Sequence, residues 1–260
     1  MHNLFKVGGV GVNCLSSDHV LHCVEHALHE QSGFRLATLN MDHVVQLLRN
    51  GSFRSAYSCH EMVSADGWPV ALAYRFAGFR VSVAAGSDLL LPILALAESS
   101  ASKVAFVGSS TNNLSVARDR LLAKFPNLDI CYLHSPSFPF NPTGPEANGI
   151  LNEMIAKDVK LCILALGAPK QEVFAASAAA LGTKIGFCSF GAALDFVAGS
   201  QVRAPRWLRL ARLEWAWRWC RQPRRMSKRY FQSAIMIPKL LGYAFRHRFA
   251  MLRFSEPGIP

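Results

Sequence analysis

An unbroken run of six apolar residues, Leu161–Leu166, limits what this chain can fold into more than any other feature of its sequence. Successive side chains of a strand point to opposite faces of a sheet, so a strand that is apolar at every position must be covered on both faces. Similar apolar runs recur at Lys103–Val107 and Lys184–Phe190, with helix-length segments between them. This alternation predicts the α/β class, with a mostly parallel sheet and helices on both faces.

The same alternation gives the expected elements and a division of the chain into two parts. Strands are expected at Phe5–Asn13, Phe34–Leu39, Glu61–Ser64, Lys103–Val107, Asp129–Leu133, Val159–Leu166 and Lys184–Phe190. Helices are expected at Met41–Arg49, Pro69–Phe76, Asp88–Ser99, Asn113–Lys124, Glu146–Ala156 and Gln171–Leu181. The composition changes near Gly199, which predicts a doubly wound, Rossmann-like domain over residues 1–199 and a helical appendage over residues 200–260.

Positive charge is concentrated in the C-terminal part of the chain. The formal net charge is +11, and fourteen of the 28 Lys and Arg residues lie between Arg203 and Arg253, where Glu214 is the single acid. The first 202 residues hold fourteen basic and fifteen acidic groups, so they are almost neutral. A neutral body with a cationic tail predicts a protein that binds an anionic membrane surface.

The tail also has the pattern of an amphipathic helix that begins near Pro205. Trp207, Leu210 and Trp217 recur at helical spacing with arginines between them, and a second basic amphipathic stretch covers Ser227–Phe254. Aromatic and arginine side chains on one helix favour an interface with anionic headgroups, although part of this face could pack on the body instead. No apolar run is long enough to span a bilayer and no signal peptide opens the chain, so we expect a peripheral protein.

Polar or glycine-bearing turns follow several expected strands, at the edge where a doubly wound sheet binds its ligand. These turns are Thr38-Leu-Asn40, Ala65-Asp66-Gly67, Gly108–Thr111, Gly167–Glu172 and Gly191. Asp66 is open to two interpretations. It is either an Asx-turn or N-cap carboxylate, or a general base that deprotonates an acceptor hydroxyl. One such base is enough for a group transfer in which attack and departure occur on opposite faces of the reacting carbon.

The turn Gly167–Glu172 joins a buried strand to a helix and suits a diphosphate. Its glycine and proline fix a tight turn, and the first amides of the helix are free to meet an anion. Lys170, Gln171 and Glu172 are therefore candidates for substrate binding, with a plain capped connection as the alternative. Gly108 opens a second turn of this kind, which is rich in hydroxyl groups and also suits phosphate.

The sequence has no pattern that indicates a metal ion or another cofactor, and none is expected. The Asp-x-Asp pair that holds a divalent ion on many nucleotide sugars is absent, as are the glycine patterns of nucleotide-binding loops. Four histidines do have helical spacing, and we expect them on a solvated helix face rather than around a metal. They are His19, His22, His26 and His29.

Several short motifs occur in one order along about residues 5–230. They are Thr38-Leu-Asn40, Ala65-Asp-Gly67, Gly86-Ser-Asp-Leu89, Phe106-Val-Gly108, Gly167-Ala-Pro-Lys-Gln-Glu172, Phe190–Phe196 with Ala198-Gly199, Arg203-Ala-Pro-Arg-Trp207, Leu213-Glu-Trp215, Arg218, Pro223 and Arg229-Tyr230. In these motifs the chain resembles the WecG/TagA/CpsF glycosyltransferases of bacterial surface-polysaccharide and teichoic-acid synthesis. Its basic, tryptophan-rich tail resembles the exopolysaccharide branch of that family, which includes a glucosyltransferase of xanthan synthesis.

The resemblance implies a metal-independent, inverting transfer of a hexose. The donor would be a UDP-sugar, and the acceptor a sugar linked to undecaprenyl diphosphate at the cytoplasmic face of the inner membrane. It also implies that Asp66 is the base and that Thr38, Asn40 and Gln171 line the substrate cleft. The appendage would close over the site while touching the membrane.

Arginines of the appendage are implied as the groups that stabilise the departing nucleotide diphosphate, among them Arg203, Arg206 and Arg212. One position departs from the family pattern. The family commonly has an arginine three residues before its G-x-D-L element, and Val83 stands there in this chain. Either the nearby Arg80 supplies the charge or the donor is held differently.

The identity of the sugar is left open by the sequence. UDP-glucose, added to glucosyl-diphosphate-undecaprenol, is the first expectation, and an N-acetylmannosamine or mannosaminuronic acid donor is the second. A nucleic-acid-binding protein would spread its basic residues over the body surface, so no nucleic acid partner is expected. A non-catalytic scaffold would turn over no nucleotide sugar. Whether several copies assemble into a homo-oligomer is also left open.

Overall fold

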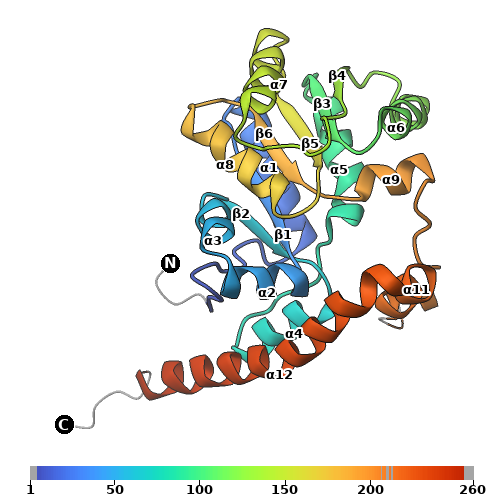
Figure 1. Cartoon of the computed structure of the whole chain (residues 1–260). Coiled ribbons are helices and arrows are strands. Elements are labelled where there is room, and N and C mark those ends of the chain that lie inside the picture. The colour runs from blue at the N-terminus through green and yellow to red at the C-terminus, as the bar shows by residue number, and fades with distance from the viewer. Residues whose placement is uncertain (1–4, 206, 209–210, 212, 255–260) are drawn as a thin grey trace.

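A six-stranded, all-parallel sheet forms the centre of the protein in a computed structural model, which describes residues 5–205, 207–208, 211 and 213–254 (Figure 1). The strand order is β2-β1-β6-β5-β3-β4. The strands are β1 (Arg35–Leu39), β2 (Met62–Ala65), β3 (Val104–Gly108), β4 (Ile130–His134), β5 (Leu161–Ala165) and β6 (Gly186–Ser189). The expected α/β class with a parallel sheet is confirmed.

Helices cover both faces of this sheet, as expected. They are α1 (Ser17–His29), α2 (Met41–Arg49), α3 (Gly51–Ser58), α4 (Trp68–Phe76), α5 (Gly86–Ser99), α6 (Thr111–Lys124), α7 (Pro145–Ala156), α8 (Lys170–Ala180), α9 (Ala193–Ala198), α11 (Glu214–Arg221) and α12 (Pro223–Phe254). Helices α1, α5, α6 and α9 pack on one face. Helices α7 and α8 pack on the other, where α3 lies against α8.

Strand β5 shows why the run Leu161–Leu166 is apolar throughout. Leu161 and Ile163 pack into the core with α1 and α5, whereas Cys162 and Leu164 pack with α7 and α8. All four side chains are fully buried. Burial of a large aliphatic side chain contributes about 1.5–3 kcal/mol to the free energy of unfolding, so this strand fixes the position of the sheet between its two helix layers.

The strand expected over residues 5–13 does not form. Val7 and Val10 pair only with each other, because Gly8 and Gly9 turn the chain back with positive φ values of 59° and 85°. The apolar side chains of this segment are nevertheless buried. The apolar residues are thus part of the core, but the strand prediction was wrong because the two glycines interrupt the extended backbone.

Two helices, α3 and α9, were not expected. The side chain of Asn50 caps α3 by accepting a hydrogen bond from the backbone amide of Phe53 at 3.1 Å. Phe53 and Tyr57 lie one turn apart on the buried face of this helix. An N-cap residue followed by apolar residues at this spacing is a helix signal that the sequence contained.

The C-terminal helix α12 runs along α2 and α4 (Figure 1). Met236, Leu240 and Ala244, spaced four residues apart, are buried in the same core cluster as residues of α2 and α4. The helix expected from Pro205 falls partly outside the described residues. Trp207 and Leu208 are helical, Ala211 and Leu213 are not, and α11 follows from Glu214. Within the part of the chain that the structure describes, no helix is both long and apolar enough to cross a bilayer.

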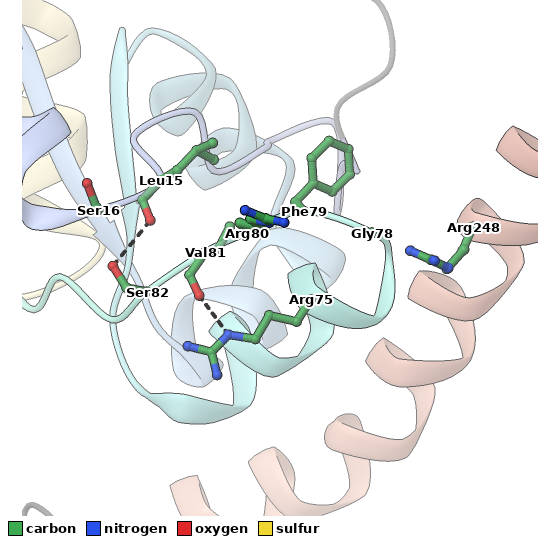
Figure 2. Close-up of a pocket in the computed structure, with 9 residues that line it drawn as sticks. All are labelled: Leu15, Ser16, Arg75, Gly78, Phe79, Arg80, Val81, Ser82 and Arg248. Atoms are coloured by element: carbon green, nitrogen blue, oxygen red, sulfur yellow. Dashed lines mark hydrogen bonds between the residues drawn. The ribbon is translucent and has the colours of Figure 1, made fainter.

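A solvent-open depression of about 520 Å³ lies at the C-terminal end of α4 (Figure 2). The segment before α1, the segment after α4 and one residue of α12 line it. Three segments that are distant in the sequence therefore meet there.

Candidate active site

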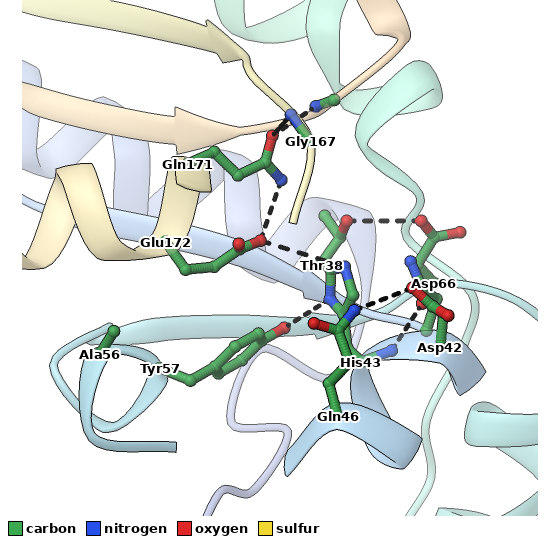
Figure 3. Close-up of polar contacts among 12 residues, drawn as sticks. Thr38, Asp42, His43, Gln46, Ala56, Tyr57, Asp66, Gly167, Gln171 and Glu172 are labelled. Carbon is green, nitrogen blue, oxygen red and sulfur yellow. Dashed lines mark hydrogen bonds and ion pairs between the residues drawn. The ribbon is translucent and has the colours of Figure 1, made fainter. Parts of the chain in front are cut away.

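Asp66 directly follows β2, at the carboxyl edge of the sheet. Its backbone amide donates to the carbonyl of Leu39 at 2.8 Å, which places it beside the end of β1. Its Oδ2 lies 3.4 Å from the hydroxyl of Thr38, a buried residue of β1 (Figure 3). Gly67, and not Asp66, is the N-cap of α4, and it makes no side-chain cap hydrogen bond. The carboxylate is therefore not used to cap the helix.

The surroundings of Asp66 make its carboxylate a stronger base than usual. Burial raises its pKa from 3.8 to about 6, an effect that the positive charge of Arg218 opposes and the negative charge of Glu214 reinforces. The Thr38 hydrogen bond also lowers this pKa. A carboxylate with a pKa near 6 is ionised at neutral pH and still able to accept a proton in a transition state, as a general base requires.

Arg218 is a site residue that the sequence analysis quoted in a motif without giving it a role. It lies on α11, and its charge acts on Asp66 from that helix. Its guanidinium donates to Glu214 at 2.6 Å and stands 5.7 Å from the ring centre of Phe196. Asp66 and Arg218 are far apart in the sequence, and no local pattern tells where the tail returns to the sheet.

Asn40 holds the start of α2 beside this edge. Its Oδ1 accepts a hydrogen bond from the backbone amide of His43 at 3.0 Å, so Asn40 is the N-cap of α2. Thr38 is almost fully buried on β1. The structure thus brings Thr38 and Asn40 next to Asp66, as expected, and their contact with a substrate stays a prediction.

The Gln171 side chain is buried and ties two turns together (Figure 3). Its Oε1 accepts hydrogen bonds from the backbone amides of Gly167 at 3.2 Å and Gly191 at 3.1 Å. Gly167 follows β5 and Gly191 follows β6. Its Nε2 donates to Oε1 of Glu172 at 2.9 Å. The amide thus has a bracing function, and a direct contact of Gln171 with a substrate remains a prediction.

Glu172 lies inside the core, fully buried. Its Oε1 is 4.0 Å from Nε2 of His43, and Nδ1 of His43 is 3.4 Å from the hydroxyl of Tyr57. Burial raises the pKa of Glu172 to about 7. Because the carboxylate has no solvent-exposed surface, its effect on a substrate would pass through Gln171.

Lys170, the first residue of α8, is only half-buried. Its ammonium lies 5.6 Å from the ring centre of Phe138, a side chain that is 95% exposed. Among the three candidates of this turn, Lys170 is therefore the one whose side chain reaches solvent at the carboxyl edge of the sheet.

Gly108 has a packing reason to be glycine. Its φ is +113°, and a Cβ atom there would lie 2.4 Å from the carbonyl carbon of Ala165 on β5. In the turn that follows, the hydroxyl of Ser109 donates to Asp195 of α9, and Asn113 donates to the same carboxylate at 3.1 Å. The turn after Gly108 is thus joined to α9, and phosphate binding by Gly108 stays a prediction.

The structure describes only one of the three appendage arginines expected at the site. Arg203 makes an ion pair with Asp88 of α5 at 2.7 Å, and Arg206 and Arg212 lie outside the described residues. Arg80 lines the depression at the C-terminal end of α4, while Asp66 precedes the N-terminal end of that helix.

The early histidines lie on the surface of the protein. The four histidines of α1 are exposed, on the face opposite its buried residues, as expected for a solvated helix face. No group of three or more His, Cys, Asp or Glu side chains within the described ranges is placed to hold a metal ion.

Comparison with known proteins identifies the class of protein and its family. Residues 5–252 match the model of the glycosyl transferase WecG/TagA/CpsF family. The chain therefore belongs to this family, as its motifs predicted. It is similar to the N-acetylglucosaminyldiphosphoundecaprenol N-acetyl-beta-D-mannosaminyltransferase of Bacillus spizizenii, with 23% identity over 229 residues that cover 88% of this chain and 85% of that protein.

Proposed function

We propose that this protein transfers a hexose from a UDP-sugar to a sugar linked to undecaprenyl diphosphate, with inversion at the anomeric carbon. The observation that carries the proposal is the position of Asp66. Its carboxylate is ionised at neutral pH, is raised in basicity by burial, and is not used to cap α4. Family membership supplies the class of reaction.

In the proposed step, Asp66 accepts the proton of the acceptor hydroxyl as that oxygen attacks the anomeric carbon of the donor. The bond between this carbon and the diphosphate oxygen breaks, and UDP leaves from the opposite face with the electron pair. Negative charge therefore develops on the diphosphate. Among the described cations, Arg218 is the one whose positive charge lowers the pKa of Asp66. We assign Arg218, together with Arg203, Arg206 and Arg212, to stabilise the charge on the diphosphate.

The turns after β5 and β6 support binding of the donor. Gln171 fixes the backbone at Gly167 and Gly191, and Lys170 adds a positive charge at the start of α8. The first amides of a helix attract an anionic group. We therefore place the diphosphate near these turns, with Gly108 at the neighbouring strand end.

Two donors compete in this proposal, each with its own support. The name of the similar Bacillus spizizenii protein favours N-acetylmannosamine as the transferred sugar. The basic, tryptophan-rich tail favours the exopolysaccharide branch of the family and hence UDP-glucose. We rank UDP-N-acetylmannosamine first, because its support comes from a match over most of both chains.

We further propose that the protein binds the cytoplasmic face of the inner membrane peripherally, through an appendage over residues 200–260. Several aromatic side chains of this part are 46–69% exposed and occur among exposed arginines. They include Trp207, Trp215, Trp219, Phe231, Phe245 and Phe249. Exposed aromatic and basic side chains together favour binding to an anionic bilayer.

The test is incubation with a panel of UDP-sugars and synthetic lipid-diphosphate monosaccharides, with products identified by mass spectrometry. We expect a product one hexose or N-acetylhexosamine heavier than the acceptor, with the anomeric configuration of the donor inverted. If none of the UDP-sugars in the panel gives a product, the proposal is contradicted and a scaffold is favoured. Salt-dependent binding to DNA without vesicle binding would favour a nucleic-acid-binding protein instead.

A further inference from the structure

The depression at the C-terminal end of α4 has a positively charged lining (Figure 2). Arg75 comes from the last turn of α4, Arg80 from the segment after it, and Arg248 from α12. None of the described residues that line the depression is acidic. Positive charge gathered in a concave surface without a paired carboxylate attracts anions.

Two of the three arginines, Arg75 and Arg248, have contacts within the depression. The Arg75 side chain donates through Nε to the carbonyl of Val81 at 2.8 Å. Gly78 has a φ of +101°, and a Cβ atom there would lie 2.7 Å from Nη1 of Arg248. The absence of a side chain at Gly78 thus lets the Arg248 guanidinium approach the backbone at the end of α4.

The end of α4 explains part of this arrangement without any ligand. Cations are stabilised at the C-terminal end of a helix, and Arg75 and Arg248 both lie there. Arg80 lies beyond the helix and is exposed, and the hydroxyl-bearing Ser16 and Ser82 line the same depression. The hydroxyl of Ser16 accepts from the backbone amide of His19, and that of Ser82 donates to the carbonyl of Leu15. The guanidinium of Arg80 is therefore the additional donor, which the helix end does not need and which suits a phosphate.

The surroundings of Arg248 indicate which phosphate compound would bind. Phe245, Phe249 and Leu252 of α12 are 55%, 49% and 54% exposed, so apolar surface borders the charged depression. A lipid matches both parts, because its phosphate would enter the depression while its acyl chains would lie along the apolar side chains. We propose that this depression binds the phosphate headgroup of an anionic membrane lipid.

The proposed lipid site rests on the membrane association proposed above, and it is independent of the sugar and of the reaction. It is also separate from Asp66. Helix α4 begins just after Asp66 and has nine residues, so about 13 Å of helix lies between the two places. A lipid bound there would hold α4, and with it the base at its other end, in a defined position relative to the bilayer.

The test is vesicle flotation of the full-length protein and of the variants Arg80→Glu and Arg248→Glu. The vesicles are phosphatidylcholine alone, an equal mixture with phosphatidylglycerol, and an equal mixture with a fatty acid. Lys157→Glu, an exposed position at the end of α7 on the far side of the molecule from α12, is the matched control (Figure 1). Thermal unfolding of each variant shows that it is folded.

We expect the wild type to prefer phosphatidylglycerol vesicles, and each arginine variant to bind them about tenfold more weakly. The control should bind like the wild type. Equal binding to fatty-acid and phosphatidylglycerol vesicles would overturn the phosphate site, since only general charge attraction would be left. Equal weakening in the control would overturn it as well. Absence of binding to every vesicle would refute this site and the membrane association together, whereas sugar transfer to a short-chain soluble acceptor tests the reaction separately.

Discussion

Two sides of the candidate site are built in different ways. On one side, the turns after β5 and β6 are fixed from below by buried groups, since Gln171 bonds to both turns and is itself oriented by Glu172. On the other side, α11 acts on Asp66 through the charge of Arg218, and the ion pairs of this region are partly exposed. Arg203 pairs with Asp88, and Arg218 pairs with Glu214 within the helix itself.

The difference indicates which side is fixed and which is able to move. An exposed ion pair contributes about 0–1 kcal/mol, whereas a buried polar group that loses its partner costs about 1–3 kcal/mol. The donor-side turns are therefore expected to keep their geometry, whereas these ion pairs add little that would hold α11 in one position. We expect substrates to enter by displacement of α11 and to be enclosed when Arg218 returns.

The largest effect is expected from the base that both sides surround. Asp66→Asn keeps the size of the side chain but removes its ability to accept a proton, so it should lower kcat by about 10²–10⁴. Donor binding, measured by calorimetry with the UDP-sugar, should stay nearly unchanged. A variant as active as the wild type would refute the role of Asp66.

The next effect tests the movable side. Arg218→Ala should lower kcat/KM by about 10², because a positive charge next to the departing diphosphate is lost. Arg221→Ala is the control, since Arg221 lies on the same helix and stacks on Trp217 rather than acting on Asp66. Similar losses in both variants would show that α11 matters only as a folded helix.

The pH dependence of kcat/KM distinguishes Asp66 from Glu172, the two carboxyl groups whose pKa is raised by burial. Since protonated Asp66 cannot act as a base, kcat/KM should fall about tenfold per pH unit below pH 6. Glu172→Gln should leave this acidic limb in place, because Glu172 titrates inside the core. An acidic limb near the ordinary Asp pKa of 3.8 would contradict the effect of burial.

A smaller effect is expected on the fixed side. Glu172→Ala leaves Nε2 of Gln171 without its acceptor and should lower kcat/KM about tenfold, as the two turns lose their brace. Glu172→Gln keeps an acceptor oxygen and should stay within about threefold of the wild type. Equal losses in both variants, measured by initial rates, would mean that the charge of Glu172 and not its hydrogen bond is needed.

The smallest effect is on stability. Asp66 binds its proton up to about pH 6 when folded but only to about 3.8 when unfolded, so its ionised form disfavours the folded state at higher pH. Asp66→Asn should therefore raise the free energy of unfolding by about 1–2 kcal/mol at pH 8. Below pH 3.8 the gain should vanish. Urea unfolding at both pH values checks this, and a destabilised variant at pH 8 would contradict it.

Much of the sheet and its helices could be predicted because their signals are local. Strand β5 is indicated by apolar residues at every position. Helix α2 was predicted with the bounds that it has in the structure, Met41–Arg49. The strand prediction failed at residues 5–13, because burial of apolar residues such as Val7 and Val10 does not require a strand. Gly8 and Gly9 were the signal against it.

The site could be predicted only in part, for a related reason. Asp66 and Asn40 follow strands directly, so their position at the carboxyl edge follows from the order of elements. The bracing function of Gln171 depends on Gly191, which belongs to another turn. The influence of Arg218 on Asp66 depends on the path of the whole tail. Such long-range contacts leave no spacing pattern in the sequence.

Helix α12 has a consequence for any shortened form of this protein. The apolar core beside α2 and α4 is completed by Met236, Leu240 and Ala244 of α12. Asn40 is the N-cap of α2, and α4 begins shortly after Asp66. A protein cut at Gly199 would not be the same enzyme released from its membrane. Removal of α12 would expose the apolar core next to the base. Loss of turnover in such a fragment would therefore reflect damage to this core before it reflected loss of lipid binding.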